Sequence, residues 1–275
     1  MNRENWNPGF LDISPIFGPF KPLQNAISNF SDWPSVEDLD LLKQMADRPI
    51  ITCSDKSVCF VSQQTTEVDK FTQQYEPRIY LSGEVPTRHH NWHDFFNALV
   101  WMTFPQTKAV LNQVHFNELC RELQNNQKQR GSLRDATTLF DESGVVVISS
   151  REDLVKLLQK HEWKQLFWEQ REAVLSTMRF FVFGHGLYEK ALNPYLGMTG
   201  KGIILQVDEI YFNQPLSEQI VAADRMLQTF LLQEKFSSVD LTPIPLLGYP
   251  TWSSDNCNSV FYNNKQYFRP HPSQR

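Results

Sequence analysis

The segment from Arg88 to Trp101 predicts a helix that is apolar on almost every side, yet it contains His93, Asp94 and Asn97. A helix of that kind is normally buried, and polar side chains on a buried helix need partners or a ligand. Because His93 and Asn97 are four residues apart, they share one face, which Trp101 continues. The segment therefore predicts one wall of a polar cavity.

Composition narrows the possible functions. The chain has 275 residues, 41% of them hydrophobic and 13% aromatic, which is enough to bury a substantial core. Its formal net charge of -5 comes without blocks of one sign, so we expect no nucleic-acid partner. Four cysteines without a CxxC pair favour a reduced, cytoplasmic protein. No signal-peptide pattern and no membrane-spanning apolar stretch is present, so we expect neither export nor membrane insertion.

Prolines mark the two ends of the chain. Five lie within residues 1–34 among aromatic side chains, a density that excludes long helices, and five more follow residue 242. We predict a Pro/aromatic-rich N-terminal arm, 1–34, packed on a single α+β domain, 35–275. This domain is expected to be mainly helical, with a β-hairpin or small antiparallel sheet and irregular, proline-rich termini.

Hydrophobic periodicity and capping residues place the elements of this domain. Ser35 is expected to cap a helix that runs to about Ala46, and Phe104-Pro105 to separate two packed helices. Residues 136–148, with a turn at 141–144, predict a hairpin. The other predicted elements are strands at 58–62 and 202–207, helices at 107–123, 151–161, 162–171 and 176–192, and a helix from Ser217, its N-cap, to about Phe236.

His93 is the first candidate for chemistry. Imidazole and carboxylate groups ligate zinc, manganese or iron, and they also act as general acids and bases. A structural alternative accounts for part of this row, because Asn91 as N-cap and Asp94 as its N3 partner would form a capping-box-like pair. Asp94 is therefore expected to be structural, which leaves His93 and Asn97 to explain.

His185 and Glu189 form a second candidate pair, four residues apart on one face of a predicted helix. Such a pair can chelate one ion, or act as a base with its orienting carboxylate. Gly184 and Gly186 flank the histidine and would allow a ligand or another backbone segment to approach closely. The alternative is a packed histidine in an ordinary intrahelical ion pair.

Asp135 is a third candidate, because it opens the first strand of the predicted hairpin and could reach a pocket. Asp141 and Glu142 lie at the hairpin tip, where acidic residues are common for local reasons, so we assign them turn roles. His115, with Asn112 three residues before it, ranks lower. The sequence contains no Walker or Rossmann glycine loop, no GxSxG and no HExxH, which argues against the commonest nucleotide-binding proteins, serine hydrolases and zincins.

Five short motifs occur in order between about residues 75 and 270. They are NWHDxFNALxWxxFPxTK from Asn91, RDAxTLFDExG from Arg134, FGHxLxE from Phe183, PxPxLGxPxW from Pro243 and FRP from Phe268. Together they resemble the signature of an uncharacterised bacterial family classed as a domain of unknown function, and the resemblance implies no activity. The chain departs from it at Thr251, where such sequences tend to have glycine. A glycine there indicates a turn with positive φ, which threonine adopts at a higher cost.

These observations predict a metal-dependent or acid–base hydrolase with a buried His/Asp/Glu site. His93, His185 and Glu189 are the expected ligands of a divalent ion such as zinc or manganese, and His93, Asp135 and Asn97 the expected catalytic groups. We expect the ligand to be a small molecule or a peptide.

The alternative is a non-catalytic binding or scaffold protein with an aromatic interaction surface on its arm. Exposed aromatic side chains would favour it, because large apolar patches on a surface usually mark interfaces. The relevant side chains are Trp6, Phe10, Phe17 and Trp33.

Overall fold

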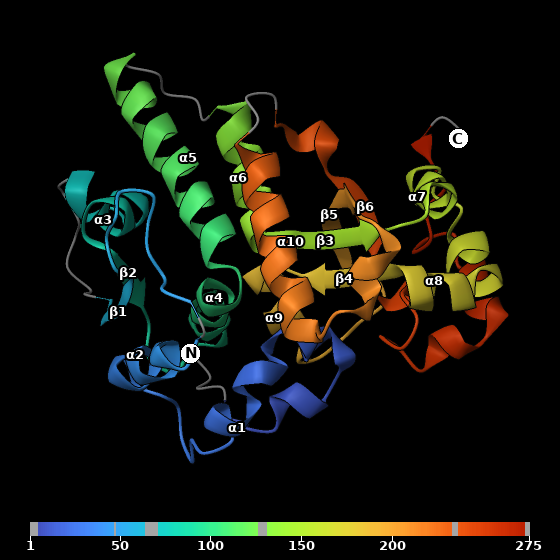
Figure 1. Cartoon of the computed structure of the whole chain (residues 1–275), viewed down its shortest axis with the longest axis horizontal. Coiled ribbons are helices and arrows are strands. Elements are labelled where there is room, and N and C mark those ends of the chain that lie inside the picture. Colours follow the sequence, from blue (N-terminus) through green and yellow to red (C-terminus); the bar gives the residue numbers. More distant parts are fainter. Residues whose placement is uncertain (1–4, 47, 64–70, 126–130, 233–235, 273–275) are drawn as a thin grey trace.

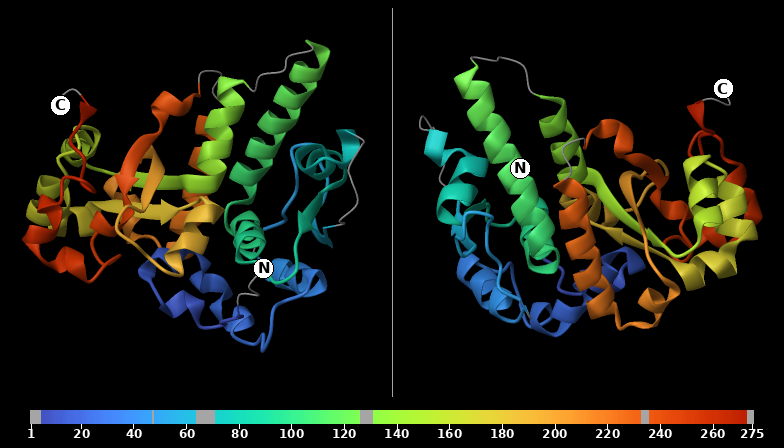
Figure 2. Two further views of the ribbon diagram at one scale, coloured as in Figure 1. Left: turned by 180° about the vertical axis from the view of Figure 1, so that it is seen from behind. Right: turned by 45° about the horizontal axis from the view of Figure 1, so that its top comes forward.

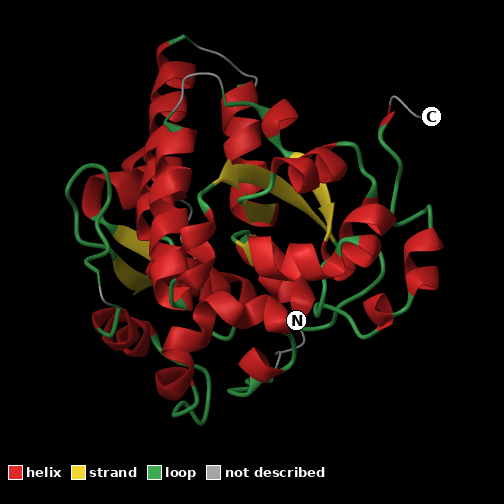
Figure 3. Cartoon of the chain, turned by 45° about the vertical axis from the view of Figure 1, so that its right-hand side comes forward, coloured by secondary structure: helices red, strands yellow, loops and turns green. Residues whose placement is uncertain are grey.

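The computed structural model covers the whole chain and describes residues 5–46, 48–63, 71–125, 131–232 and 236–272. Helices dominate the described part and enclose two small sheets, which confirms the α+β class (Figures 1 and 3). The α-helices are α1 (Gln24–Ile27), α2 (Val36–Gln44), α3 (Tyr75–Ser82), α4 (Trp92–Thr103), α5 (Pro105–Gln124), α6 (Ser132–Ser143), α7 (Glu152–Gln159), α8 (Arg171–Thr177), α9 (His185–Ala191) and α10 (Leu216–Leu231).

The larger sheet has the strand order β4-β3-β5-β6. Its strands are β3 (Gly144–Ser149), β4 (Met178–Val182), β5 (Thr199–Gln206) and β6 (Thr242–Pro245). β3 runs antiparallel to β4 and parallel to β5, and β6 pairs antiparallel with β5. The predicted antiparallel sheet is therefore a mixed one. Every residue of β3 is buried, as expected for a central strand covered on both faces.

A second sheet pairs β1 (Cys59–Ser62) in parallel with β2 (Glu84–Thr87), which confirms the strand predicted at 58–62. It lies with α2 and α3 on one side of α4 and α5, while the larger sheet lies on the other side (Figures 1 and 2). Ser35 caps α2 as predicted, in a capping box with Asp38. No helix in the described residues is long and apolar enough to cross a lipid bilayer.

The N-terminal arm is packed into the core. Phe10, Phe17 and Phe20 are fully buried, and they contact Phe96 of α4 and Tyr188 of α9. Burying one such side chain contributes roughly 1.5–3 kcal/mol, so the arm stabilises the two helices that it covers. Among the four side chains proposed for an interaction surface, Phe10 and Phe17 are inaccessible, while Trp6 and Trp33 are half-buried and stack near Trp92. The non-catalytic scaffold alternative depended on exposed aromatic side chains in the arm, and these side chains are buried or half-buried.

A buried carboxylate joins α10 to the start of α5. Asp224 is fully buried and accepts hydrogen bonds from the backbone amides of Gln106 and Thr107 and from the Thr107 hydroxyl. Arg48 completes the arrangement with an ion pair of 3.1 Å. The first amides of a helix have no partner within the helix. Asp224 accepts from the two such amides that follow Pro105 at the start of α5, and its negative charge suits this end of the helix.

Two predicted elements are wrong. Residues 136–140 do not form the first strand of a hairpin; they belong to α6, which continues through Asp141 and Glu142 and ends immediately before β3. Residues 176–192 are not one helix either, because α8 ends at Thr177 and the apolar run that follows forms β4. Both errors concern short apolar runs, whose periodicity does not separate a buried strand from a buried helix.

The last long helix begins earlier than predicted. α10 starts at Leu216 after Pro215, so Ser217 lies inside its first turn and is not its N-cap. The helix also ends at Leu231, several residues before Phe236. The fixed φ angle of a proline suits the start of a helix. The prediction relied on Ser217 as the N-cap and overlooked Pro215.

We expect Asp224→Ala to lower the free energy of unfolding by about 3–5 kcal/mol, because it leaves Arg48 and two backbone amides without their acceptor. Asp224→Asn, which keeps one acceptor oxygen, should cost less. Chemical unfolding followed by tryptophan fluorescence measures both. Asp208→Ala, at an exposed position, is the control and should change stability by less than about 0.5 kcal/mol. Equal effects at the two positions would contradict the role of Asp224.

Thr251 occupies the left-handed region with φ 77°, at the position where the resemblance predicted a glycine turn. A β-branched residue at positive φ carries backbone strain. Thr251→Gly should therefore raise the free energy of unfolding by about 1 kcal/mol, after the entropy that glycine adds to the unfolded chain is subtracted. Thr251→Ala keeps the Cβ atom and should recover little of this gain. Equal stabilities for the glycine and alanine variants would show that the turn is not strained.

Candidate metal centre

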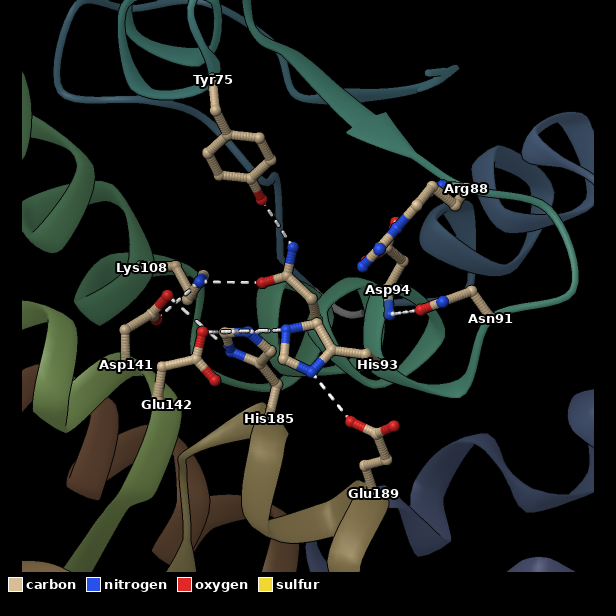
Figure 4. Close-up of polar contacts among 11 residues, drawn as sticks. Tyr75, Arg88, Asn91, His93, Asp94, Lys108, Asp141, Glu142, His185 and Glu189 are labelled. Atoms are coloured by element: carbon tan, nitrogen blue, oxygen red, sulfur yellow. Dashed lines mark hydrogen bonds and ion pairs between the residues drawn. The ribbon is translucent and has the colours of Figure 1, made fainter. Parts of the chain in front are cut away.

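Three helices meet around His93 and His185, the two histidines that were predicted from the sequence as metal ligands. α4 carries His93 in its first turn, α9 begins at His185, and α6 ends beside both (Figure 4). Asn91 caps α4 by accepting a hydrogen bond from the Asp94 amide at 3.0 Å. This cap fixes where the helix begins, and hence the direction in which His93 points.

Two glycines allow α9 to begin directly against the end of α6. A Cβ atom on Gly184 would lie 2.5 Å from the carbonyl oxygen of Glu142, and one on Gly186 would lie 2.8 Å from the Glu142 carboxylate. Position 184 faces backbone atoms and so accepts only glycine, whereas a side chain at position 186 would displace the Glu142 carboxylate. The predicted role of these glycines is confirmed, and the backbone segment that approaches them is the last turn of α6.

The imidazoles of His93 and His185 face each other. Their Nε2 atoms are 3.0 Å apart, and the rings meet edge to face with centroids 4.4 Å apart. Glu142 completes a triangle, because its Oε1 lies 3.7 Å from His93 Nε2 and 3.4 Å from His185 Nε2. The His185 side chain is 6% exposed, His93 27% and Glu142 43%, so the triangle has one buried corner and an open side.

Glu189 lies behind His93. Its Oε2 is 3.0 Å from His93 Nδ1, where the ring N–H donates to the carboxylate. This hydrogen bond raises the pKa of His93 and lowers the pKa of Glu189. In the neutral ring it leaves the lone pair on Nε2, which points into the triangle. Glu189 therefore contacts His93 and not His185, although the sequence spacing had suggested the latter.

Asp141 holds the matching position behind His185. Its Oδ2 lies 3.8 Å from His185 Nδ1, too far for a hydrogen bond, and its Oδ1 forms a 2.6 Å ion pair with Lys108. Burial opposes ionisation of Asp141, but the Lys108 ammonium together with the imidazoles of His185 and His115 outweighs it and keeps the pKa of Asp141 lowered. Among the described residues, His185 Nδ1 is a buried nitrogen without a hydrogen-bond partner.

No neutral tautomer of His185 suits this arrangement. A proton on Nδ1 faces the Asp141 carboxylate but sets two Nε2 lone pairs 3.0 Å apart. A proton on Nε2 can donate to His93 but leaves a bare Nδ1 lone pair facing a carboxylate. A positive charge between the two Nε2 atoms, carried by a proton or a metal ion, removes the conflict.

Lys108 and Asn97 form the inner wall of the centre. The Lys108 side chain is 5% exposed, donates to Asn97 Oδ1 at 2.9 Å, and lies 5.4 Å from the ring centroid of Trp101. Asn97 in turn donates to the Tyr75 hydroxyl at 2.7 Å. The predicted row of His93, Asn97 and Trp101 thus lines a polar wall, and Asn97 serves to hold Lys108.

The same face of α5 stays polar beyond Lys108. Asn112 and His115 follow it at four and seven residues, and both are buried. Asn112 donates to the Glu76 carboxylate at 2.7 Å, and burial raises the pKa of Glu76 to about 7. His115, the lower-ranked candidate, therefore belongs to a polar seam between helices next to the centre, and not to the histidine triangle.

The remaining predicted residues lie outside the triangle. Asp135 is exposed in the first turn of α6, about 9 Å along the helix from Asp141. Asp94 is structural, as predicted, but its carboxylate accepts hydrogen bonds from the backbone and guanidinium of Arg88 and not from the Asn91 amide of the predicted capping-box-like pair. Sequence reasoning missed Glu142, Asp141 and Lys108. It read the first two as turn residues, and nothing in the spacing distinguishes Lys108 from a surface lysine.

The fold and the centre define an α+β protein with a His/Glu/His cluster whose geometry is compatible with a metal ion. The chain belongs to the family described as "Protein of unknown function (DUF3025)", whose sequence profile matches residues 58–272. Comparison with the curated proteins and with the solved structures finds no match. Family membership supplies no activity, so function has to be inferred from the centre itself.

We expect Lys108→Met to lower the free energy of unfolding by about 3–5 kcal/mol, because it leaves the Asp141 carboxylate buried without its cation. Adding Asp141→Asn to the lysine variant should recover part of the loss, since the buried charge is then gone. Urea unfolding of the single and double variants measures the difference. A double variant no more stable than Lys108→Met would contradict the ion pair as the source of the loss.

Proposed function

We propose that the chain binds one divalent metal ion through His93, His185 and Glu142 and uses it for hydrolysis. The observation that carries the proposal is the triangle of ligand atoms, with edges of 3.0, 3.4 and 3.7 Å. A four-coordinate ion with ligands at about 2.1 Å holds neighbouring ligand atoms about 3.4 Å apart. The side chains need little movement to reach that geometry.

The donor set suits zinc better than manganese. Two imidazole nitrogens and one carboxylate oxygen with an open fourth position are the arrangement of many catalytic zinc sites, whereas manganese prefers more oxygen ligands. Such an ion supplies Lewis acidity and lowers the pKa of a water molecule bound to it. The exposed side of the triangle, formed by Glu142 and His93, is where water and substrate have access.

Charge balance supports a divalent cation over a proton. Three carboxylates, those of Glu142, Glu189 and Asp141, surround the two imidazoles. Lys108 offsets one of these charges. With both rings neutral, the centre keeps an excess of two negative charges, which one divalent ion cancels and one proton does not.

Within this proposal, the chain's residues have separate tasks. Glu142 takes the ligand position first assigned to Glu189, while Glu189 orients His93 by holding its Nδ1 proton. Asp141, held by Lys108, is placed to do the same for His185. Asn97 acts on Lys108 and so is a positioning residue. Asp135 has no part in the proposed chemistry.

Metal-free protein titrated with zinc should bind one equivalent, and isothermal titration calorimetry with elemental analysis measures this. His93→Ala and His185→Ala should each weaken binding by more than about 100-fold, and Glu189→Gln by about 10- to 100-fold, because it acts behind a ligand. His89→Ala is the matched control, since His89 is an exposed histidine just before the same helix and contacts Ser62. The control should bind zinc as the native chain does.

Hydrolysis is tested on the zinc-loaded protein with p-nitrophenyl esters of acetate and phosphate. Release of p-nitrophenol that is lost in His93→Ala and kept in His89→Ala would support the proposal. Zinc binding without any turnover would retain the metal site and reject these ester classes as substrates. Absence of zinc binding at micromolar concentration would reject the proposed function itself.

A further inference from the structure

A second pocket lies away from the histidine triangle, between the β5–β6 edge of the sheet and the C-terminal segment. Its volume is about 440 Å³, within the range of small-molecule sites. The C-terminal segment runs beside α7 on this side of the molecule (Figures 1 and 2). Residues of the loop that follows α7 complete the wall.

Strand register determines the floor of this pocket. Thr199 pairs with Pro245 and Lys201 pairs with Pro243, so these four side chains share one face of β5 and β6. All four line the pocket. Gly200, on the opposite face, packs towards Val145 and Leu187 in the core. The floor is thus built from a regular element, with two proline rings as its apolar part.

Two basic side chains line the pocket. Lys201 on the floor and Arg269 on the C-terminal segment both line the pocket, and no ion pair to either occurs among the described residues. No Asp or Glu of the described chain contributes to the lining. In a chain with 31 acidic and 26 basic residues, two cations that line one cavity without a carboxylate give that cavity a positive potential.

His161, in the turn that ends α7, lines the pocket. His161 has φ 57°, a left-handed conformation that glycine usually takes at the end of a helix. Its ring stacks on Trp163 at 5.0 Å and meets His271 edge to face at 5.1 Å. These ring contacts hold an imidazole at the pocket wall.

The edge strand itself is not built to receive a peptide. β6 is the outer strand of the sheet, and Pro243 and Pro245 lack the N–H groups that a docking strand would need. A ligand therefore has to be recognised by side chains inside the pocket and not by strand addition. This favours a compact molecule over an extended chain.

We propose that this pocket binds a small organic anion, with its carboxylate or phosphate head group between Lys201 and Arg269 and its apolar body on Pro243 and Pro245. The guanidinium and ammonium groups supply charge-assisted hydrogen bonds, which are stronger than neutral ones. The site is separate from the histidine triangle, so its occupancy does not depend on the metal.

The test uses the full chain and three probes with one apolar body: hexanoate, hexyl phosphate and hexanol. Isothermal titration calorimetry should show binding of one or both anions and not of hexanol. Lys201→Met and Arg269→Met should each weaken that binding by about tenfold or more. Lys21→Met, which removes an exposed lysine far along the chain, is the control and should bind like the native protein.

The outcomes separate clearly. Binding of hexanoate alone identifies a carboxylate site, and binding of hexyl phosphate alone a phosphate site. Failure of both anions to bind at millimolar concentration overturns the proposal, as does binding that the Lys201 and Arg269 variants leave unchanged. Loss in His93→Ala together with retention in both methionine variants would place the anion at the triangle and overturn the assignment to this pocket.

Discussion

The close contact between the start of α9 and the end of α6 places His185 and Glu142, two of the three groups of the histidine triangle. Phe183 and Gly184 both donate their amides to the Gly144 carbonyl at 2.9 Å, which joins the turn before α9 to the start of β3. His185 follows at once, and Glu142 lies two residues before the accepting carbonyl. A side chain at position 184 would force these segments apart, and the triangle would open with them.

The polar groups around the triangle explain one another once this contact is in place. A carboxylate behind His185 is useful only if it is ionised, and a buried carboxylate would otherwise take up a proton. Lys108 keeps Asp141 charged, and a buried ammonium in turn needs acceptors of its own. Asn97 and the face of Trp101 meet that need. Asn97, the polar side chain on the otherwise apolar helix α4, is therefore explained by Lys108, which it holds. Lys108 is in turn explained by Asp141, the carboxylate behind His185.

Local signals in the sequence gave correct predictions, whereas contacts between distant segments did not follow from it. The Asn91 cap and the shared face of His93 and Asn97 depend only on helix geometry, so both were predictable. The residues at 141–144 have the composition of a turn, and the same composition ends a helix, so the hairpin was a reasonable but wrong interpretation. Glu142 entered the site only because α6 is helical up to Ser143. The same error hid Asp141, and it moved the expected carboxylate to Asp135, two turns away on the helix.

The histidine triangle, which suits a cation, and the second pocket, which suits an anion, both lie beside the larger sheet. Gly200 of β5 faces Leu187 of α9, the helix that carries His185, while its neighbour Lys201 points to the other face and the second pocket. Layers packed on a sheet lie about 10 Å apart, and the apolar side chains between them exclude water. Within the described part of the chain, Glu142 and Glu189 pair with the two histidines and not with Lys201 or Arg269, although Gly144, next to the triangle, is the register partner of Lys201. Alternation along one strand thus allows a centre suited to a cation and a pocket suited to an anion to share a single core.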